Sequence, residues 1–142
     1  MEQVKNVFSK WNRTAGMLLI GSGTAWIIKL SVIISTNGRV IETGAAAFFM
    51  AAGMLLLLIG STGIGFFFSR RRAVWLRVLA ILCSPVLVVG SFFVFGLISS
   101  RVFQNSSIWY AQQEAPIAFA AVTYLAVGFL LYKSGQHAPL PA

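Results

Sequence analysis

The sequence has very few of the residues that carry chemistry. It contains three acidic residues, Glu2, Glu42 and Glu114, together with one histidine and one cysteine. The histidine, His137, lies near the C-terminus, away from the acids, so no pattern of residues suggests a metal site or a catalytic acid, base and nucleophile. A single cysteine, Cys83, excludes an intrachain disulfide, and its apolar surroundings predict a small buried hydrophobe. We therefore expect no enzyme, no cofactor and no metal.

Charged residues of any kind are also scarce, at 10% of the chain, whereas an average soluble domain carries roughly 25%. Hydrophobic residues make up 58%, and the mean hydropathy is +0.83. A helix needs about 20 apolar residues to cross roughly 30 Å of hydrocarbon, and four such runs account for most of the chain. The sequence therefore predicts an all-α polytopic membrane protein, a four-transmembrane-helix bundle that forms a single membrane domain over residues 1–142.

Short polar or basic segments separate the four apolar runs. Pro85 lies inside the third run and predicts a kink near Ser84, because a membrane helix accepts proline when neighbours satisfy the freed carbonyl. Pro116 suits the first turn of the fourth helix, although we expect that helix to begin further back, near Ile108. The expected helices cover residues 15–36, 44–68, 73–98 and 108–133, followed by a disordered polar tail over residues 134–142.

Basic residues are concentrated in alternate segments of the chain. Short cytoplasmic loops of membrane proteins hold an excess of Lys and Arg. Only Arg39 and Arg101 lie in the first and third connections, which predicts that both termini are in the cytoplasm. We recognise no targeting signal, so a bacterial inner membrane is the default expectation. Eight basic residues lie on the predicted cytoplasmic side, namely Lys5, Lys10, Arg13, Arg70, Arg71, Arg72, Arg77 and Lys133.

Small residues recur every seven positions in two of the runs. Lipid is as apolar as leucine, so helices in a membrane associate through close packing of small residues and through shared hydrogen bonds. Ala46, Gly53 and Gly60 therefore predict one packing face on the second helix, and Ala121 and Gly128 predict another on the fourth.

A polar stripe occurs at the same spacing in the third run. It consists of Arg77, Ser84 and Ser91, which fall on one side of a helix. Such stripes normally face other helices, so we expect packing surface inside a bundle or an oligomer. The lining of a pore is the alternative.

Lys29 is the charged residue inside an apolar run. An ionisable group costs about 2.5 to 3.5 kcal/mol at the centre of a membrane helix, so its presence needs a reason. Trp26 lies three residues before Lys29, and Ser22 lies seven residues before it. The ordinary expectation is snorkelling toward the outer boundary or a structural ion pair with Glu42 or Glu114. The functional alternative is an outward-opening cavity in which Lys29 binds an anion or an acidic headgroup.

Two further segments could contact a ligand or partner. Arg70, Arg71 and Arg72 follow an apolar run directly, which predicts an anchor for topology and, as an alternative, a contact with lipid at the inner leaflet. The connection over residues 99–115 is the longest and mixes aromatic residues with amides, so a partner contact is expected there first.

These observations favour a protein that acts by contact. We expect a small integral membrane protein without catalysis that serves as an accessory or assembly subunit, or as an immunity- or scaffold-type interaction protein. Its partners would be the lipid bilayer and either another membrane protein or further copies of itself. The net charge of +8 lies at helix ends, which points to lipid headgroups and away from nucleic acid. The alternative is a small oligomeric transporter or channel, for example for an anion, that uses Lys29 and the serines of the third helix.

Overall fold

The structure, a computed structural model, describes residues 2–40 and 43–136, with side chains from residue 10 onward. In this part of the chain all regular structure is α-helical, as predicted. All four helices include a segment long and apolar enough to cross a membrane. Glu42 and the tail beyond residue 136 lie outside the described residues. The helices are α1 (Glu2–Ser35), α2 (Gly44–Ser69), α3 (Val74–Val102) and α4 (Ala111–Gln136).

The helix limits differ from the sequence-based limits at several ends. The α1 helix begins well before the expected residue 15, because residues 2–14 include neither proline nor glycine to stop a helix. The apolar segment that could cross a membrane begins only at Lys10. The α4 helix begins at Ala111, three residues after the expected start near Ile108, so Pro116 lies in its second turn. It ends at Gln136, so residues 134–136 of the expected disordered tail are helical.

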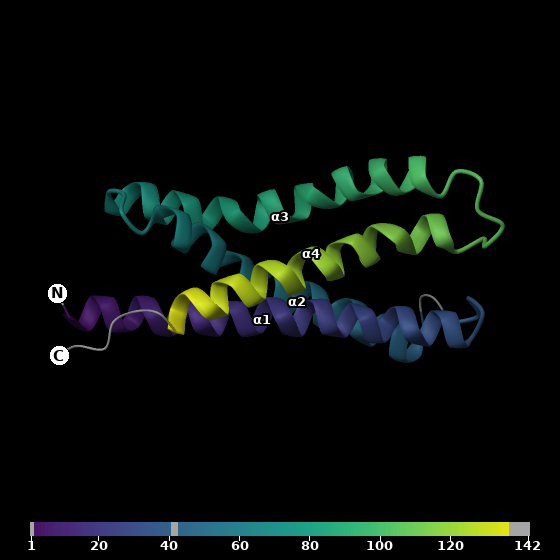
Figure 1. Cartoon of the computed structure of the whole chain (residues 1–142), viewed down its shortest axis with the longest axis horizontal. Helices are drawn as coiled ribbons and strands as arrows, with labels where there is room; N and C mark the ends of the chain where they lie inside the picture. Colours follow the sequence, from purple (N-terminus) through teal and green to yellow (C-terminus); the bar gives the residue numbers. More distant parts are fainter. Residues whose placement is uncertain (1, 41–42, 137–142) are drawn as a thin grey trace.

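Successive helices run in opposite directions along the long axis of the molecule (Figure 1). The first described turn of α1, the end of α4 and the turn between α2 and α3 lie at one end, which we call the terminal end. The α1–α2 and α3–α4 connections lie at the opposite end, which we call the distal end. The α1 helix packs most extensively against α4 and α2, whereas α3 lies to one side, with its backbone near α2 and α4 and with the ring of Phe92 against that of Trp26 on α1.

The α1–α4 interface is a close approach of two backbones at small residues. A Cβ atom placed on Gly16 would lie 2.7 Å from the carbonyl oxygen of Gly128, and one placed on Gly23 would lie 2.7 Å from that of Ala121. The two positions on each helix are seven residues apart, so the contact repeats after two turns. Ala121 and Gly128 thus form the packing face that their spacing predicts, and both are buried.

The α1–α2 interface sets large side chains of α1 against small residues of α2. Trp26 fills the space that a Cβ on Gly53 would need, and Leu19 lies where a Cβ on Gly60 would be crowded. Trp26 and Leu19 are fully buried. The predicted face of α2 is confirmed, since Ala46, Gly53 and Gly60 are all buried. Each of the two glycines therefore leaves room for one large side chain of α1. These two contacts together define the register of α1 against α2.

The α3 helix is the least packed of the four. Its buried residues are Ser84, Val88 and Ser99, while α2 and α4 bury many more. It approaches α2 closely near the terminal end, where a Cβ on Gly65 would collide with the carbonyl oxygen of Ala80. The expectation that Cys83 is buried is wrong, because this residue lies on the exposed side of α3. An apolar run identifies a helix but does not indicate which of its sides meets other helices.

Replacing Gly128 by alanine is expected to destabilise the bundle, whereas the same change at Gly96 is not. A Cβ on residue 128 would lie 2.8 Å from the oxygen of Gly16 and 2.9 Å from the nitrogen of Ile20, but one on residue 96 meets no atom within 4 Å. We expect Gly128→Ala to lower the free energy of unfolding by about 1–3 kcal/mol, as overpacking does. Gly96→Ala should leave it unchanged or slightly higher. Unfolding in mixed dodecylmaltoside–SDS micelles, followed by circular dichroism, measures both; equal stabilities would contradict this packing scheme.

Candidate functional site

A buried ion pair joins α1 to α4 in the distal half of the bundle. The Lys29 ammonium donates a hydrogen bond of 2.7 Å to Oε2 of Glu114, and the two side chains are only 5% and 6% exposed. Of the two glutamates expected as partners for Lys29, the structure pairs it with Glu114, and Glu42 lies outside the described residues. Lys29 is therefore bonded to α4 inside the bundle.

The position of Glu114 follows from how α4 begins. Glu114 lies in the first turn of the helix, where a carboxylate interacts favourably with the positive end of the helix dipole. Its backbone N–H donates to the carbonyl oxygen of Tyr110, so the turn that precedes α4 is continuous with the helix. This arrangement directs the carboxylate toward α1 at the level of Lys29.

The turn after α1 packs against the residues that precede α4. Gly38 has a φ of 76°, which glycine adopts without steric cost, and it is buried. A Cβ there would lie 2.7 Å from ring atoms of both Trp109 and Tyr110. This contact holds the start of α4 beside the end of α1. It therefore helps to keep the Glu114 carboxylate near the Lys29 ammonium.

Two further residues of the predicted charge site extend the polar contacts along α1. Ser22 is fully buried and donates a 2.7 Å hydrogen bond to the carbonyl oxygen of Gly53. The indole N–H of Trp26 donates to the carbonyl oxygen of Met50 at 3.4 Å. Both bonds reach α2, whereas Lys29 reaches α4. The polar residues on these sides of α1 therefore bind the two neighbouring helices.

Two basic residues near the distal end, Arg39 and Arg101, lie outside this pair. Both are exposed, and no ion pair of the described residues includes them. The pair of Lys29 and Glu114 carries no net charge and is shielded from solvent, so it is a poor site for capturing a free anion. Such a pair, buried with little exposure, chiefly specifies how two helices are joined.

The polar stripe of α3 divides among three different environments. Arg77 donates to the carbonyl oxygens of Arg70 and Arg72 and so fastens the turn between α2 and α3. Ser84 is buried and returns its hydroxyl to the carbonyl oxygen of Ile81 in its own helix. The stripe therefore faces other parts of the bundle.

Ser91, the third residue of this stripe, joins α3 to a residue that the sequence analysis overlooked. Its hydroxyl lies 2.6 Å from that of Tyr124, which is buried on α4. The Tyr124 hydroxyl also donates to the carbonyl oxygen of Val88 at 3.4 Å. The sequence does contain a signal for this contact. Tyr124 lies in the middle of an apolar run, and a buried phenol needs a hydrogen-bond partner.

The predicted inner-leaflet cluster is exposed at the terminal end. Arg70, Arg71 and Arg72 all lie in the turn between α2 and α3, and the guanidinium carbon of Arg70 lies 4.7 Å from the ring centre of Phe67. On the neighbouring pair of helices, Arg13 donates to the hydroxyl of Tyr132 at 3.4 Å. The terminal end thus carries the basic residues on the surface, where they are accessible to an anionic group.

No group of three or more histidine, cysteine or acidic residues that could hold a metal ion occurs in the described part of the chain. No protein-family model matches the chain, and no match was found among curated proteins or solved structures.

Removing one partner of the buried ion pair should destabilise the protein, and removing both should restore much of the loss. Lys29→Met leaves the Glu114 carboxylate buried without its partner, which we expect to cost about 3–5 kcal/mol. In the double variant Lys29→Met, Glu114→Gln no charge is left unpaired. Thermal unfolding in detergent of these proteins and of Arg39→Met, an exposed control, measures the effect. Wild-type stability in Lys29→Met would refute a structural role for the pair.

Proposed function

We propose that this chain is an integral membrane protein that crosses the bilayer four times with both termini in the cytoplasm, and that it acts by contact with another membrane protein. Its helices expose large apolar side chains along their length, for example Phe48, Leu87 and Phe93, which are 67%, 73% and 77% exposed. Water solvates such a surface poorly, whereas lipid or a partner helix covers it at no cost. The exposed arginines at the terminal end support the orientation.

The contact proposal rests on the surroundings of the glycines, which differ between α3 and the other three helices. Most glycines of α1, α2 and α4 are close to another helix, and a Cβ on them would collide with that helix. Gly90 and Gly96 of α3 have nothing within 4 Å of a Cβ position. Glycine inside a helix costs about 0.5–1 kcal/mol relative to alanine, so a glycine that admits no neighbour has no stabilising role in the isolated chain. Gly90 is exposed, and a helix of a partner packed on that side of α3 would account for it.

Two small residues lie on one exposed side of α3. Cys83 and Gly90 are seven residues apart, so they fall on the same side, and both are exposed. Small residues let two helix backbones approach closely in a membrane. The arrangement supports an accessory or assembly subunit that docks through α3.

The hydrogen bonds inside the bundle favour contact over transport. A transport path along Lys29 and the serines of α3 would need these groups to face a wet cavity. In the described structure Lys29 is bonded to Glu114, and the hydroxyl of Ser91 is bonded to that of Tyr124. Groups engaged in this way stabilise the bundle, and an ion would have to break those bonds to use them.

The first test is purification of tagged protein from its native membrane in mild detergent, followed by mass spectrometry of the proteins that remain bound. A stoichiometric membrane protein is the expected result. Cys83, the single cysteine of the chain, allows a direct check, because a thiol-reactive bifunctional reagent added to intact membranes should link it to that partner. A chain that links only to itself would replace the proposal by a homo-oligomer, and a monomer without partner would overturn it.

Gly90→Leu is expected to release the partner while the protein stays folded. Overpacking of a helix interface costs about 1–3 kcal/mol, so recovery of the partner should fall about tenfold. Ala51→Leu is the matched control, since residue 51 is also exposed but lies on α2. Quantitative mass spectrometry of both purified variants measures the difference. Equal recovery of the partner with the two variants would exclude the Gly90 side of α3 as the contact.

A further inference from the structure

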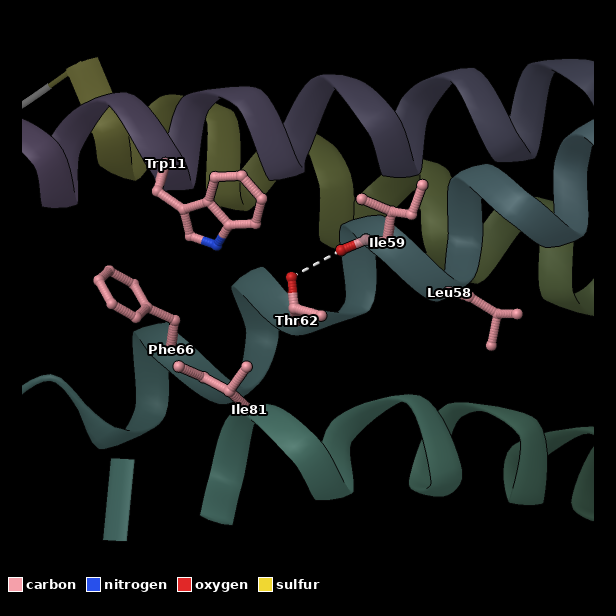
Figure 2. A pocket seen from close by; sticks show the side chains of 6 residues that line it. All are labelled: Trp11, Leu58, Ile59, Thr62, Phe66 and Ile81. Carbon is pink, nitrogen blue, oxygen red and sulfur yellow. Dashed lines mark hydrogen bonds between the residues drawn. The ribbon is translucent and has the colours of Figure 1, made fainter. Parts of the chain in front are cut away.

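A shallow groove near the terminal end is bordered by three helices and lies far along α1 from the buried ion pair. It has a volume of about 590 Å³ and is widely open to the outside. In Figure 2 the side chains of Trp11 from α1 and Ile81 from α3 point toward α2, which forms the floor between them. The lining residues are Trp11, Leu58, Ile59, Thr62, Phe66 and Ile81.

The chemistry of the lining selects an apolar occupant. Only Trp11 and Thr62 bring polar side-chain atoms to the groove, and the Thr62 hydroxyl already donates to the carbonyl oxygen of Ile59 at 2.7 Å (Figure 2). An ion or a sugar would find almost no hydrogen-bond partner here. A hydrocarbon chain, in contrast, would contact apolar carbon along nearly the whole surface.

The length of the groove fits one leaflet. Along α2 the lining extends from Leu58 to Phe66, a rise of about 12 Å for eight residues. One leaflet contributes about half of the roughly 30 Å hydrocarbon core. A single acyl chain that enters from the leaflet at the terminal end would therefore lie along the groove with its headgroup at the helix ends.

Basic residues lie beside the groove at that same end. Exposed Lys10 directly precedes Trp11, and exposed Arg70 follows Phe66 by four residues, in each case toward the terminal end. On α3, Arg77 precedes Ile81 by four residues and holds the turn through the carbonyl oxygens of Arg70 and Arg72. Positive charge thus borders the groove where a lipid phosphate would be.

We propose that this groove binds one acyl chain of an anionic phospholipid whose headgroup contacts Lys10 and Arg70. The inference depends on the membrane location proposed above but not on the partner at α3. The membrane location and the lipid site can fail separately. Alkaline carbonate extracts a protein that is not embedded in the membrane, so extraction tests the membrane location alone. The lipid experiments below use only carbonate-resistant protein.

Native mass spectrometry of the protein in dodecylmaltoside, titrated with phosphatidylglycerol or with phosphatidylcholine of identical acyl chains, tests the proposal. We expect one phosphatidylglycerol to be retained preferentially, by about fivefold for each basic residue near its headgroup. The variant Lys10→Gln, Arg70→Gln should retain the two lipids equally. Equal retention of both lipids by the wild-type protein would overturn the proposal.

Filling the groove provides the second test. Thr62→Phe should lower the retention of both lipids by about tenfold, the loss expected when roughly two methylene groups leave the groove. Val122→Phe, at an exposed position of α4, is the control and should bind as the wild type does. Unchanged retention in a folded Thr62→Phe protein would contradict the assignment.

Photolabelling of the wild-type protein decides the question independently of whether Thr62→Phe folds. A phosphatidylglycerol with a diazirine in its acyl chain should label residues 58–66 of α2 more than the exposed side of α3. Labelling spread evenly over the exposed helix surfaces would indicate only bulk lipid and would overturn the assignment.

Discussion

Close approach of α1 to two neighbouring helices is the constraint on which the rest of the structure depends. Gly16 and Gly23 admit α4 on one side, and on the other side Leu19 and Trp26 enter the space left by glycines of α2. Dispersion contacts replace the hydrophobic effect as the driving force between helices in lipid, so a short distance between backbones is needed for strong packing. The α1 helix consequently forms the centre of the bundle, and α3 remains at its side.

The polar residues complete this arrangement because they have partners only in the packed state. Lys29 reaches Glu114 on α4, Ser22 reaches a carbonyl of α2, and Tyr124 links α4 to Ser91 of α3. Buried polar groups cost free energy unless bonded, so each bond disfavours other rotations of the helices. Close packing brings the helices together, and the hydrogen bonds select one mutual orientation.

The weak packing of α3 gives the molecule two different sides. On the packed side the glycines and polar groups are matched within the chain, whereas Gly90 of α3 meets no atom that would explain it. Near the terminal end, α3 completes an apolar groove bordered by basic residues. The two proposals therefore concern separate places, a partner helix on the outer side of α3 and a lipid chain between α3, α2 and α1.

The sequence by itself determined the features that belong to single segments: four apolar helices, and the packing faces marked by residues seven positions apart such as Gly53 and Gly60. Tertiary structure decided which glutamate pairs with Lys29, the partner of Tyr124, and the exposure of Cys83. The physical reason is that these contacts depend on the rotation and spacing of helices relative to one another. Those quantities arise from packing between residues far apart in the chain, which a periodic pattern in one segment does not contain.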